Sequence, residues 1–442
     1  MSLRRQAVGL TIMHAVDVLQ PLLILPYAAH VLGAQQFGVF AYAMAIGQLA
    51  ATFVEYGFHW TAQRAAGAAR NEPLVLATLF ADVLLTKAAL CFLITTVGLV
   101  AANSVLGISQ PMFLCAMLTA FGGIVFPGWL LIGLERAWQA AVATVSARIC
   151  AFVSFVLLVR SPEQVAFAVA SQSAVPLVAG LVSLPLIRSI GVAGLRPVRL
   201  ARIITQLRNG WAGFLYTLVE RILTTLPMLL VHHYGGYVAA GHYSLAEKFV
   251  SATRPFFRTL VDTLLPRVAF YARHNPKAGL RLVWLSLSSL AIGLGLSLGL
   301  LIVAPMIIIP IFGASFAGSI PIVRLLAIVP LLLNANACTS NLFMFNYGYE
   351  RAWPVLNAAS LAIFVLASLL MLSVLANATT AVSLAVVARE ALVFLVSASF
   401  LIAFTVGEMR NSASTVLHFG GSLRVAAAIP AAVRALRPPP AP

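Results

Sequence analysis

Long apolar stretches dominate the chain, and short polar or basic connections separate them. A bilayer span needs roughly 20 mostly apolar residues, and a helix satisfies its backbone hydrogen bonds internally. The pattern therefore predicts an all-α integral membrane protein with about twelve transmembrane helices. The expected spans cover residues 10–32, 37–59, 77–101, 108–133, 139–159, 164–187, 209–233, 237–266, 281–310, 319–345, 354–375 and 380–406.

Composition supports this interpretation and excludes several classes of protein. Of the 442 residues, 61% are hydrophobic and 9% are charged, and the mean hydropathy is +0.98. Soluble domains carry about 25% charged residues, so no soluble domain large enough for an active site is expected. No GxxxxGK[ST] motif occurs, which excludes an intrinsic P-loop ATPase. The four cysteines lie apart in apolar runs, so we expect no disulfide and no metal site. Because the catalytic HExxH motif is also missing and no such soluble domain is expected, we expect no cofactor and no enzyme activity.

The basic residues predict the orientation of the chain. The net charge is +16, and most Lys and Arg residues fall on one alternating set of connections. The positive-inside rule makes these connections cytoplasmic, together with both termini. Because the positive charge is explained by topology, nucleic acid is not an expected partner. The predicted parts are an N-terminal six-helix lobe (1–188), a basic cytoplasmic linker (189–208), a C-terminal six-helix lobe (209–406) and a cytoplasmic tail (407–442).

A short repeat indicates that the two halves are related. The hexapeptide at 133–138 closes the fourth span, and the one at 348–353 closes the tenth; five of their six residues are identical. Because each half contains an even number of spans, both halves keep the same orientation. The sequence therefore predicts two pseudo-symmetric lobes related by an axis along the membrane normal.

Ionisable residues inside the spans are the candidate functional groups. Each costs about 2.5–3.5 kcal/mol at the centre of a membrane helix, so it must pair, reach the interface or line a cavity. In the eighth span Glu247, Arg254, Arg258 and Asp262 recur at helical spacing and share one face. Two arginines one turn apart repel each other, and a doubly anionic ligand relieves that repulsion. Arg324 is a further intramembrane cation, in the tenth span.

The other intramembrane and interfacial charges have two interpretations each. Ion or proton coupling is the functional interpretation for some acids, and hydrogen-bonded pairing within the bundle is the structural one. Conformational gating competes with interfacial anchoring for the charges of the repeated hexapeptides. The coupling candidates are Asp17, Glu55, Asp82 and Glu247, and the gating candidates are Glu135, Arg136, Glu350 and Arg351.

Several segments resemble a known family. They include Leu32–Gly38, Glu55–Phe58, Phe126–Arg136 and Gly241–Lys248. In order and spacing these segments are similar to O-antigen and exopolysaccharide flippases (the Wzx-like polysaccharide transport family) of the multidrug/oligosaccharidyl-lipid/polysaccharide exporter superfamily. The resemblance implies a two-lobed, twelve-helix protein of the bacterial cell inner membrane.

The resemblance also implies a substrate, partners and a cationic cavity. Such proteins move undecaprenyl-diphosphate-linked oligosaccharide units from the cytoplasmic to the periplasmic leaflet by alternating access. Membrane lipid and the polymerase and chain-length proteins of the same pathway are the implied partners. The family often carries a basic residue in its first or second span, whereas this chain has acids there. Lys87 and Arg148 are the residues that would supply positive charge in the first half.

Three alternatives stay open at this point. A small-molecule antiporter of the same superfamily would export cations, which the paired arginines disfavour. A lipid II flippase would share the fold and the diphosphate chemistry. A membrane-embedded polysaccharide polymerase would need a sizeable extracytoplasmic loop, and the predicted loops on that side are short.

Overall fold

The computed structural model describes residues 3–191, 200–349 and 352–417, and every regular element in these ranges is helical. The all-α prediction is therefore confirmed. The α-helices are α1 (Leu3–Glu55), α2 (Phe58–Ala68), α3 (Pro73–Ala101), α4 (Gln110–Val125), α5 (Gly128–Gly133), α6 (Ala137–Leu158), α7 (Val165–Ser173), α8 (Val175–Ile190), α9 (Leu200–Ser251), α10 (Arg254–His274), α11 (Pro276–Ser286), α12 (Leu290–Phe312), α13 (Ser319–Leu326), α14 (Val329–Asn336), α15 (Ala352–Val374) and α16 (Ala378–Leu417). Short 3-10 turns cover Pro162–Gln164, Leu287–Ser289 and Ala314–Phe316, and a π-helix, η4, covers Ala337–Met344.

Ten segments of the described chain are long and apolar enough to cross a membrane. Two of them, Leu19–Glu55 with 37 residues and Ala201–His274 with 74 residues, extend over more than one predicted span. Each corresponds to two predicted spans, which accounts for the twelve predicted crossings. The protein is therefore a multi-pass membrane protein, as expected.

Glycines with left-handed backbone divide the two long segments. Gly33 has φ 64° and ψ 172°, and Gly236 has φ 72° and ψ −173°. Glycine adopts this conformation without the steric cost that a side chain would add. The same backbone conformation occurs at the matching place in each half of the chain, between the first two spans and between the seventh and eighth. This match supports the internal repeat that the hexapeptides indicated.

Close helix packing follows immediately after these breaks. A β-carbon on Gly38 would overlap the carbonyl oxygen of Tyr237, and one on Gly241 would overlap that of Ala34. The start of the second span therefore lies directly against the start of the eighth, with backbone touching backbone. Only glycine permits this approach at both positions.

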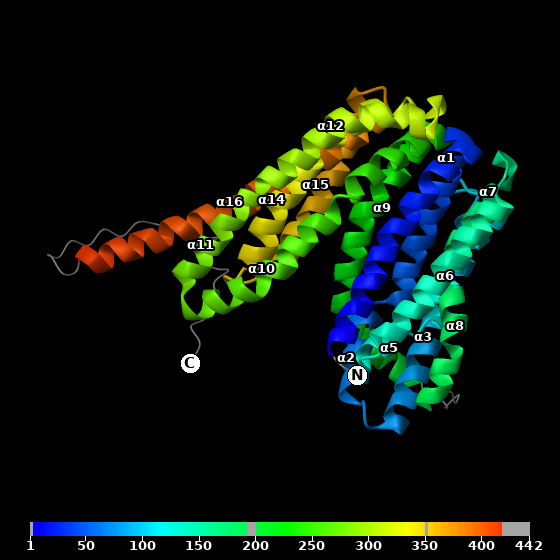
Figure 1. Ribbon diagram of the computed structural model, residues 1–442, viewed down its shortest axis with the longest axis horizontal. Coiled ribbons are helices and arrows are strands. Elements are labelled where there is room, and N and C mark those ends of the chain that lie inside the picture. The colour runs from blue at the N-terminus through cyan, green and yellow to red at the C-terminus, as the bar shows by residue number, and fades with distance from the viewer. Residues whose placement is uncertain (1–2, 192–199, 350–351, 418–442) are drawn as a thin grey trace. The chain divides into compact units, whose positions relative to one another are not determined.

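Two compact units make up the described chain. The first comprises residues up to Ser244 together with Ile309–Ala317, and the second comprises Leu245–Ile308 and the residues from Gly318 onward. In the first unit α1 packs on α4, α6 and α7, and α8 covers α4 and α6 (Figure 1). Residues 209–244 pack with this unit, although the sequence assigns them to the second lobe. The predicted lobe boundaries stay a prediction.

The core of the second unit lies among α10, α11, η4 and α16. Val268 and Val283 are fully buried there, as are Leu342 and Phe343 of the π-helix. α15 packs along α16. This core covers one face of α10 and leaves its charged residues on other faces. The predicted linker is helical from Leu200 onward, and the predicted tail continues α16 as far as Leu417; residues 192–199 and 418–442 lie outside the described ranges.

Candidate functional site

Lys87 and Glu55 form an ion pair inside the first unit. The Lys87 ammonium on α3 donates to Glu55 Oε1 at 2.7 Å and to the Gly123 carbonyl oxygen at 2.9 Å. The Lys87 side chain is 1% exposed, whereas the Glu55 side chain at the end of α1 is 37% exposed. A β-carbon on Gly123 would lie 3.2 Å from Glu55 Oε1, so glycine leaves room for the carboxylate. The structure thus pairs a predicted cavity cation with a predicted coupling acid.

Asp82 has a cationic neighbour that the sequence assigned to the linker. Its side chain on α3 is 5% exposed, and Oδ1 lies 3.7 Å from Nε of Arg202 near the start of α9. This separation is longer than a hydrogen bond but short enough for a strong Coulomb attraction in a poorly solvated place. Sequence reasoning missed Arg202 because a linker residue gives no sign of which span it approaches.

Arg148 belongs to a chain of polar side chains within the first six spans. Its guanidinium donates to Gln20 Oε1 at 2.9 Å, and the Gln20 amide donates to Gln172 Oε1 at 2.9 Å. Gln20 is buried, and Gln172 also donates to the Ala151 carbonyl oxygen at 3.3 Å. These glutamines are functional-site candidates that the sequence reasoning did not include. The feature of the sequence that could have identified them is a polar amide side chain inside an otherwise apolar span.

Arg221, in the seventh span, contacts the polar face of the second span. Its guanidinium on α9 donates to Gln48 Oε1 at 3.0 Å and to Thr52 Oγ1 at 3.2 Å, both on α1. Glu55 follows one turn later on the same face, where it meets Lys87. The acidic and polar face of the second span is therefore matched by cations from the third and seventh spans.

The second unit presents Arg254 and Arg258 on an exposed face of α10. The Arg254 side chain is 46% exposed and lies 3.8 Å from Glu247, and Arg258 is 71% exposed and lies 3.7 Å from Asp262. Lys248 lies 3.5 Å from the same Glu247. These pairs are longer than charge-assisted hydrogen bonds, which measure about 2.7–2.9 Å. Both guanidiniums therefore keep donors directed away from their acids.

A helix break positions this cationic face. α9 ends at Ser251 and α10 begins at Arg254, with Pro255 in its first turn. Between the two helices the Thr253 hydroxyl donates to the Val250 carbonyl oxygen at 2.7 Å. Proline is favoured in the first turn of a helix, where no backbone hydrogen bond is lost. Pro255 therefore lies where α10 begins and does not bend an existing helix.

An apolar groove of about 280 Å³ adjoins this break. Phe249 and Thr253 line one wall, and α12 contributes the opposite wall through Gly295, Gly299 and Val303. A β-carbon on Gly295 or Gly299 would meet nothing within 4 Å. These two glycines therefore leave the groove open rather than pack against another helix.

The remaining predicted residues lie apart from these groups. Glu135 forms an exposed ion pair with Arg70 at 2.6 Å, and its φ of 58° is unusual for a residue with a side chain. Arg136 is half-buried next to it, and Arg324 is exposed on α13. Glu350 and Arg351 lie outside the described residues, and so does the side chain of Asp17. The gating and coupling roles stay predictions.

A buried polar group in the second unit was not among the predicted site residues. Glu390 on α16 accepts from Arg389 at 2.6 Å and from Asn336 at 2.8 Å. Asn336 directly precedes the π-helix, an element that is often found at functional sites. Over the described part of the chain, no cluster of three or more His, Cys, Asp or Glu residues could hold a metal ion.

The membrane-spanning helices and the ion pairs within them define a class of protein, a multi-pass helical membrane protein. Its fold is that of a multidrug resistance MATE family transporter of the MOP superfamily in an inward-facing conformation, with a TM-score of 0.68 over 87% of this chain and 95% of the other. At 15% sequence identity, this likeness concerns the fold alone.

The sequence comparisons give the family. Residues 3–272 match the model of the family described as "Polysaccharide biosynthesis protein", and the chain belongs to that family. A protein of Escherichia coli (strain K12) named "Putative O-antigen transporter" is 25% identical over 82% of this chain and 88% of its own length. A protein of the same name from Shigella dysenteriae is 22% identical over 79% and 88%. The resemblance inferred from the sequence motifs is confirmed.

Proposed function

We propose that this protein translocates undecaprenyl-diphosphate-linked oligosaccharide units from the cytoplasmic to the periplasmic leaflet by alternating access. The observation that carries the proposal is the pair of exposed, loosely held arginines at 254 and 258 beside an open apolar groove. The named O-antigen transporters support the same substrate class. The units transported would serve O-antigen or exopolysaccharide assembly.

The arginine pair supplies chemistry suited to a diphosphate. Arg254 and Arg258 are separated by one helical turn, which places their side chains next to each other on one face. A diphosphate offers several anionic oxygens, and each guanidinium can bind two of them in a bidentate manner. Without substrate, Glu247 and Asp262 hold the arginines at 3.8 and 3.7 Å. Substrate binding would replace these long contacts with shorter ones.

The groove supplies chemistry suited to an isoprenoid chain. Its walls are almost entirely apolar, and Thr253 places it one residue from Arg254. A ligand with an anionic head and an apolar tail would use both features at once. A small, soluble organic cation would use neither, so the observations favour a lipid-linked anion over a cationic drug.

Charges elsewhere would then contribute to the transport cycle. We infer that Lys87, Arg148 and Arg324 are further candidates for binding the glycan or its diphosphate during the cycle, and that Glu55, Asp82, Glu247 and Asp17 are the candidates for ion or proton coupling. Glu135 and Arg70 form a contact that a conformational change could break. We also propose that both termini are cytoplasmic in the bacterial inner membrane, and that polymerase and chain-length proteins act on the product.

Complementation of a bacterial strain that lacks its own polysaccharide flippase tests the proposal. Wild type and Arg254→Ala/Arg258→Ala are compared at equal membrane levels, with surface polysaccharide as the readout. We expect wild type to restore the polysaccharide and the double variant to fail. Arg273→Ala is the matched control, because Arg273 is an exposed arginine of the same helix about four turns beyond Arg258. If the double variant transports as well as wild type, the arginines do not bind substrate.

The groove has its own test. Gly299→Leu would fill the space that the isoprenoid chain is proposed to occupy, whereas Gly299→Ala would leave most of it open. We expect Gly299→Leu to reduce transport strongly while the protein remains folded, and Gly299→Ala to stay close to wild type. Full transport by Gly299→Leu would exclude this groove as the binding place of the lipid chain.

A further inference from the structure

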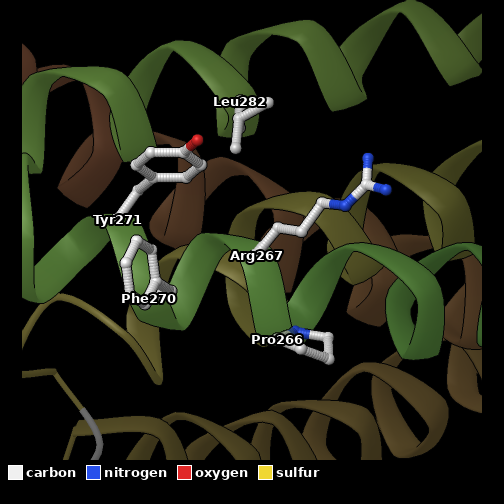
Figure 2. Close-up of a pocket in the computed structure, with 5 residues that line it drawn as sticks. All are labelled: Pro266, Arg267, Phe270, Tyr271 and Leu282. Carbon is white, nitrogen blue, oxygen red and sulfur yellow. The ribbon is translucent and has the colours of Figure 1, made fainter.

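A second pocket, of about 450 Å³, lies between α10 and α11. Pro266, Arg267, Phe270 and Tyr271 of α10 and Leu282 of α11 line it. Figure 2 shows the extended Arg267 side chain and the Tyr271 ring on the side of α10 that faces Leu282. The pocket thus combines one cation and one hydroxyl with aromatic and aliphatic walls.

This pocket does not face the proposed substrate site. Arg267 follows Arg258 by nine residues, which is about two and a half helical turns, so the two side chains leave α10 on opposite sides. The face between them that carries Val261 and Val268 is buried in the core of the unit. A ligand in the pocket would therefore be separate from one bound at Arg254 and Arg258.

The helical hairpin that forms the pocket is well fixed. α10 ends at His274, and the Asn275 side chain accepts from the backbone N–H of Ala278 at 3.2 Å to start α11. The Tyr347 hydroxyl donates to the Pro276 carbonyl oxygen at 2.9 Å and holds the turn. The His274 ring stacks on Phe270 with centroids 4.3 Å apart, which orients an aromatic wall of the pocket.

The hairpin that forms the pocket carries positive charge and, after Asp262, no acid. Arg273, Lys277 and Arg281 lie on the same hairpin, and the sequence contains no Asp or Glu between Asp262 and Glu350. Arg267 is exposed, and among the described residues no acid lies within salt-bridge distance of it in the structure. The positive-inside rule places this hairpin at the cytoplasmic surface of the membrane. Basic pockets between membrane helices on that side are suited to anionic lipid headgroups.

We propose that the pocket binds the phosphate headgroup of an anionic phospholipid of the cytoplasmic leaflet. Arg267 donates to the phosphate, the Tyr271 hydroxyl is a second donor, and Phe270 and Leu282 contact the beginning of the acyl chains. The separation from Arg254 and Arg258 assigns the pocket to a phospholipid rather than to the diphosphate of a polyprenyl-linked glycan. The bound lipid would hold the α10–α11 hairpin at a fixed depth in the membrane.

Lipid titration of the purified full chain, followed by native mass spectrometry, tests this proposal. The delipidated protein is titrated with phosphatidylglycerol and, separately, with phosphatidylcholine, which has no net negative charge. We expect phosphatidylglycerol to bind more tightly. Arg267→Gln should weaken its binding about tenfold or more, the loss expected for a charge-assisted hydrogen bond. Arg281→Gln is the matched control, because Arg281 is an exposed arginine of the same hairpin that does not line the pocket.

Further variants make the outcome decisive. Leu282→Trp fills the pocket but keeps its charge, so it should also lose the bound phospholipid, and it replaces Arg267→Gln if that variant does not fold. Equal binding of the two lipids to wild type would overturn the proposal, as would an equal loss in Arg281→Gln. If polyprenyl diphosphate displaces phosphatidylglycerol from a protein carrying Arg254→Ala/Arg258→Ala, the pocket belongs to the diphosphate instead. No displacement supports the phospholipid.

Discussion

The buried pair between Lys87 and Glu55 predicts an unequal response to the removal of either partner. The Lys87 side chain is 1% exposed and the Glu55 side chain is 37% exposed. Glu55→Leu would leave a buried ammonium with only the Gly123 carbonyl oxygen as an acceptor. Lys87→Met would leave a carboxylate that still reaches water. Loss of the acid should therefore destabilise the protein more than loss of the base.

The expected magnitudes follow from this difference in exposure. Breaking a buried pair on one side costs about 3–5 kcal/mol, because an uncompensated charge remains. Glu55→Leu should fall in that range. Lys87→Met removes the hydrogen bond to the Glu55 carboxylate, worth about 1.5–3 kcal/mol, together with the one to the Gly123 carbonyl oxygen, but the remaining carboxylate is partly hydrated. Replacing both partners by apolar residues of similar volume is often nearly neutral, so the double variant should be more stable than either single variant.

Thermal unfolding of fluorescently tagged protein, followed by size-exclusion chromatography, gives the order of stability. We expect wild type and the double variant to lie highest, followed by Lys87→Met and then Glu55→Leu. A double variant that is less stable than both single variants would refute the pairing. A transport assay then distinguishes a structural role of the pair from a role in ion or proton coupling, the two interpretations that the sequence left open for Glu55. If the stable double variant transports normally, the pair is structural; if it does not transport, the charges take part in the cycle.

Three further predictions concern single contacts. Gly38→Ala should strongly reduce the folded yield in size-exclusion chromatography, because its β-carbon would overlap the Tyr237 carbonyl oxygen. Gly295→Ala is the control and should keep its yield, because a β-carbon there meets nothing within 4 Å. An equal yield of the two variants would contradict the close packing. Glu135→Gln should change the melting temperature little, because exposed ion pairs contribute only about 0–1 kcal/mol to stability. A clear change in transport rate without a change in stability would therefore indicate a gating role for Glu135 rather than interfacial anchoring. Burial, and secondarily Glu408, raises the pKa of Tyr347 to about 12. The neutral phenol therefore favours the folded state: its contribution is complete below the unfolded pKa of about 10 and is lost as the pH rises toward 12. Tyr347→Phe should flatten the fall in melting temperature over that interval, and an unchanged slope would contradict this assignment.

Most of the fold could be predicted from the sequence, because a membrane span can be recognised from the apolar composition of one continuous segment. The twelve spans and the repeated halves follow from apolar length and from short matching segments. The glycine breaks at 33 and 236 were not predicted, although both glycines lie at the predicted ends of spans. The helices that follow these breaks pack against each other at Gly38 and Gly241, and this packing joins residues about 200 positions apart, which no local pattern in the sequence reveals.

The candidate site could be predicted only in part, and for a related reason. The face that carries Arg254 and Arg258 is visible in the sequence, because helical spacing alone brings Arg254, Arg258 and Asp262 to one face. The partners of Lys87, Asp82 and Arg148 come from other helices and leave no local pattern. The sequence could therefore list these charges but not decide between pairing and exposure.

These pairings also explain a departure from the family pattern. The first two spans carry acids where related proteins often carry a base, and the structure supplies cations to that face from elsewhere. Lys87 meets Glu55, and Arg221 meets Gln48 and Thr52, at hydrogen-bond distances. Donors committed to these contacts are less available to a substrate than those of Arg254 and Arg258, whose acids lie 3.7 Å or more away. It follows that the described cations are unequally available to an anion in the two halves of the chain. Removal of Arg254 and Arg258 should therefore impair transport more than removal of Lys87 together with Glu55.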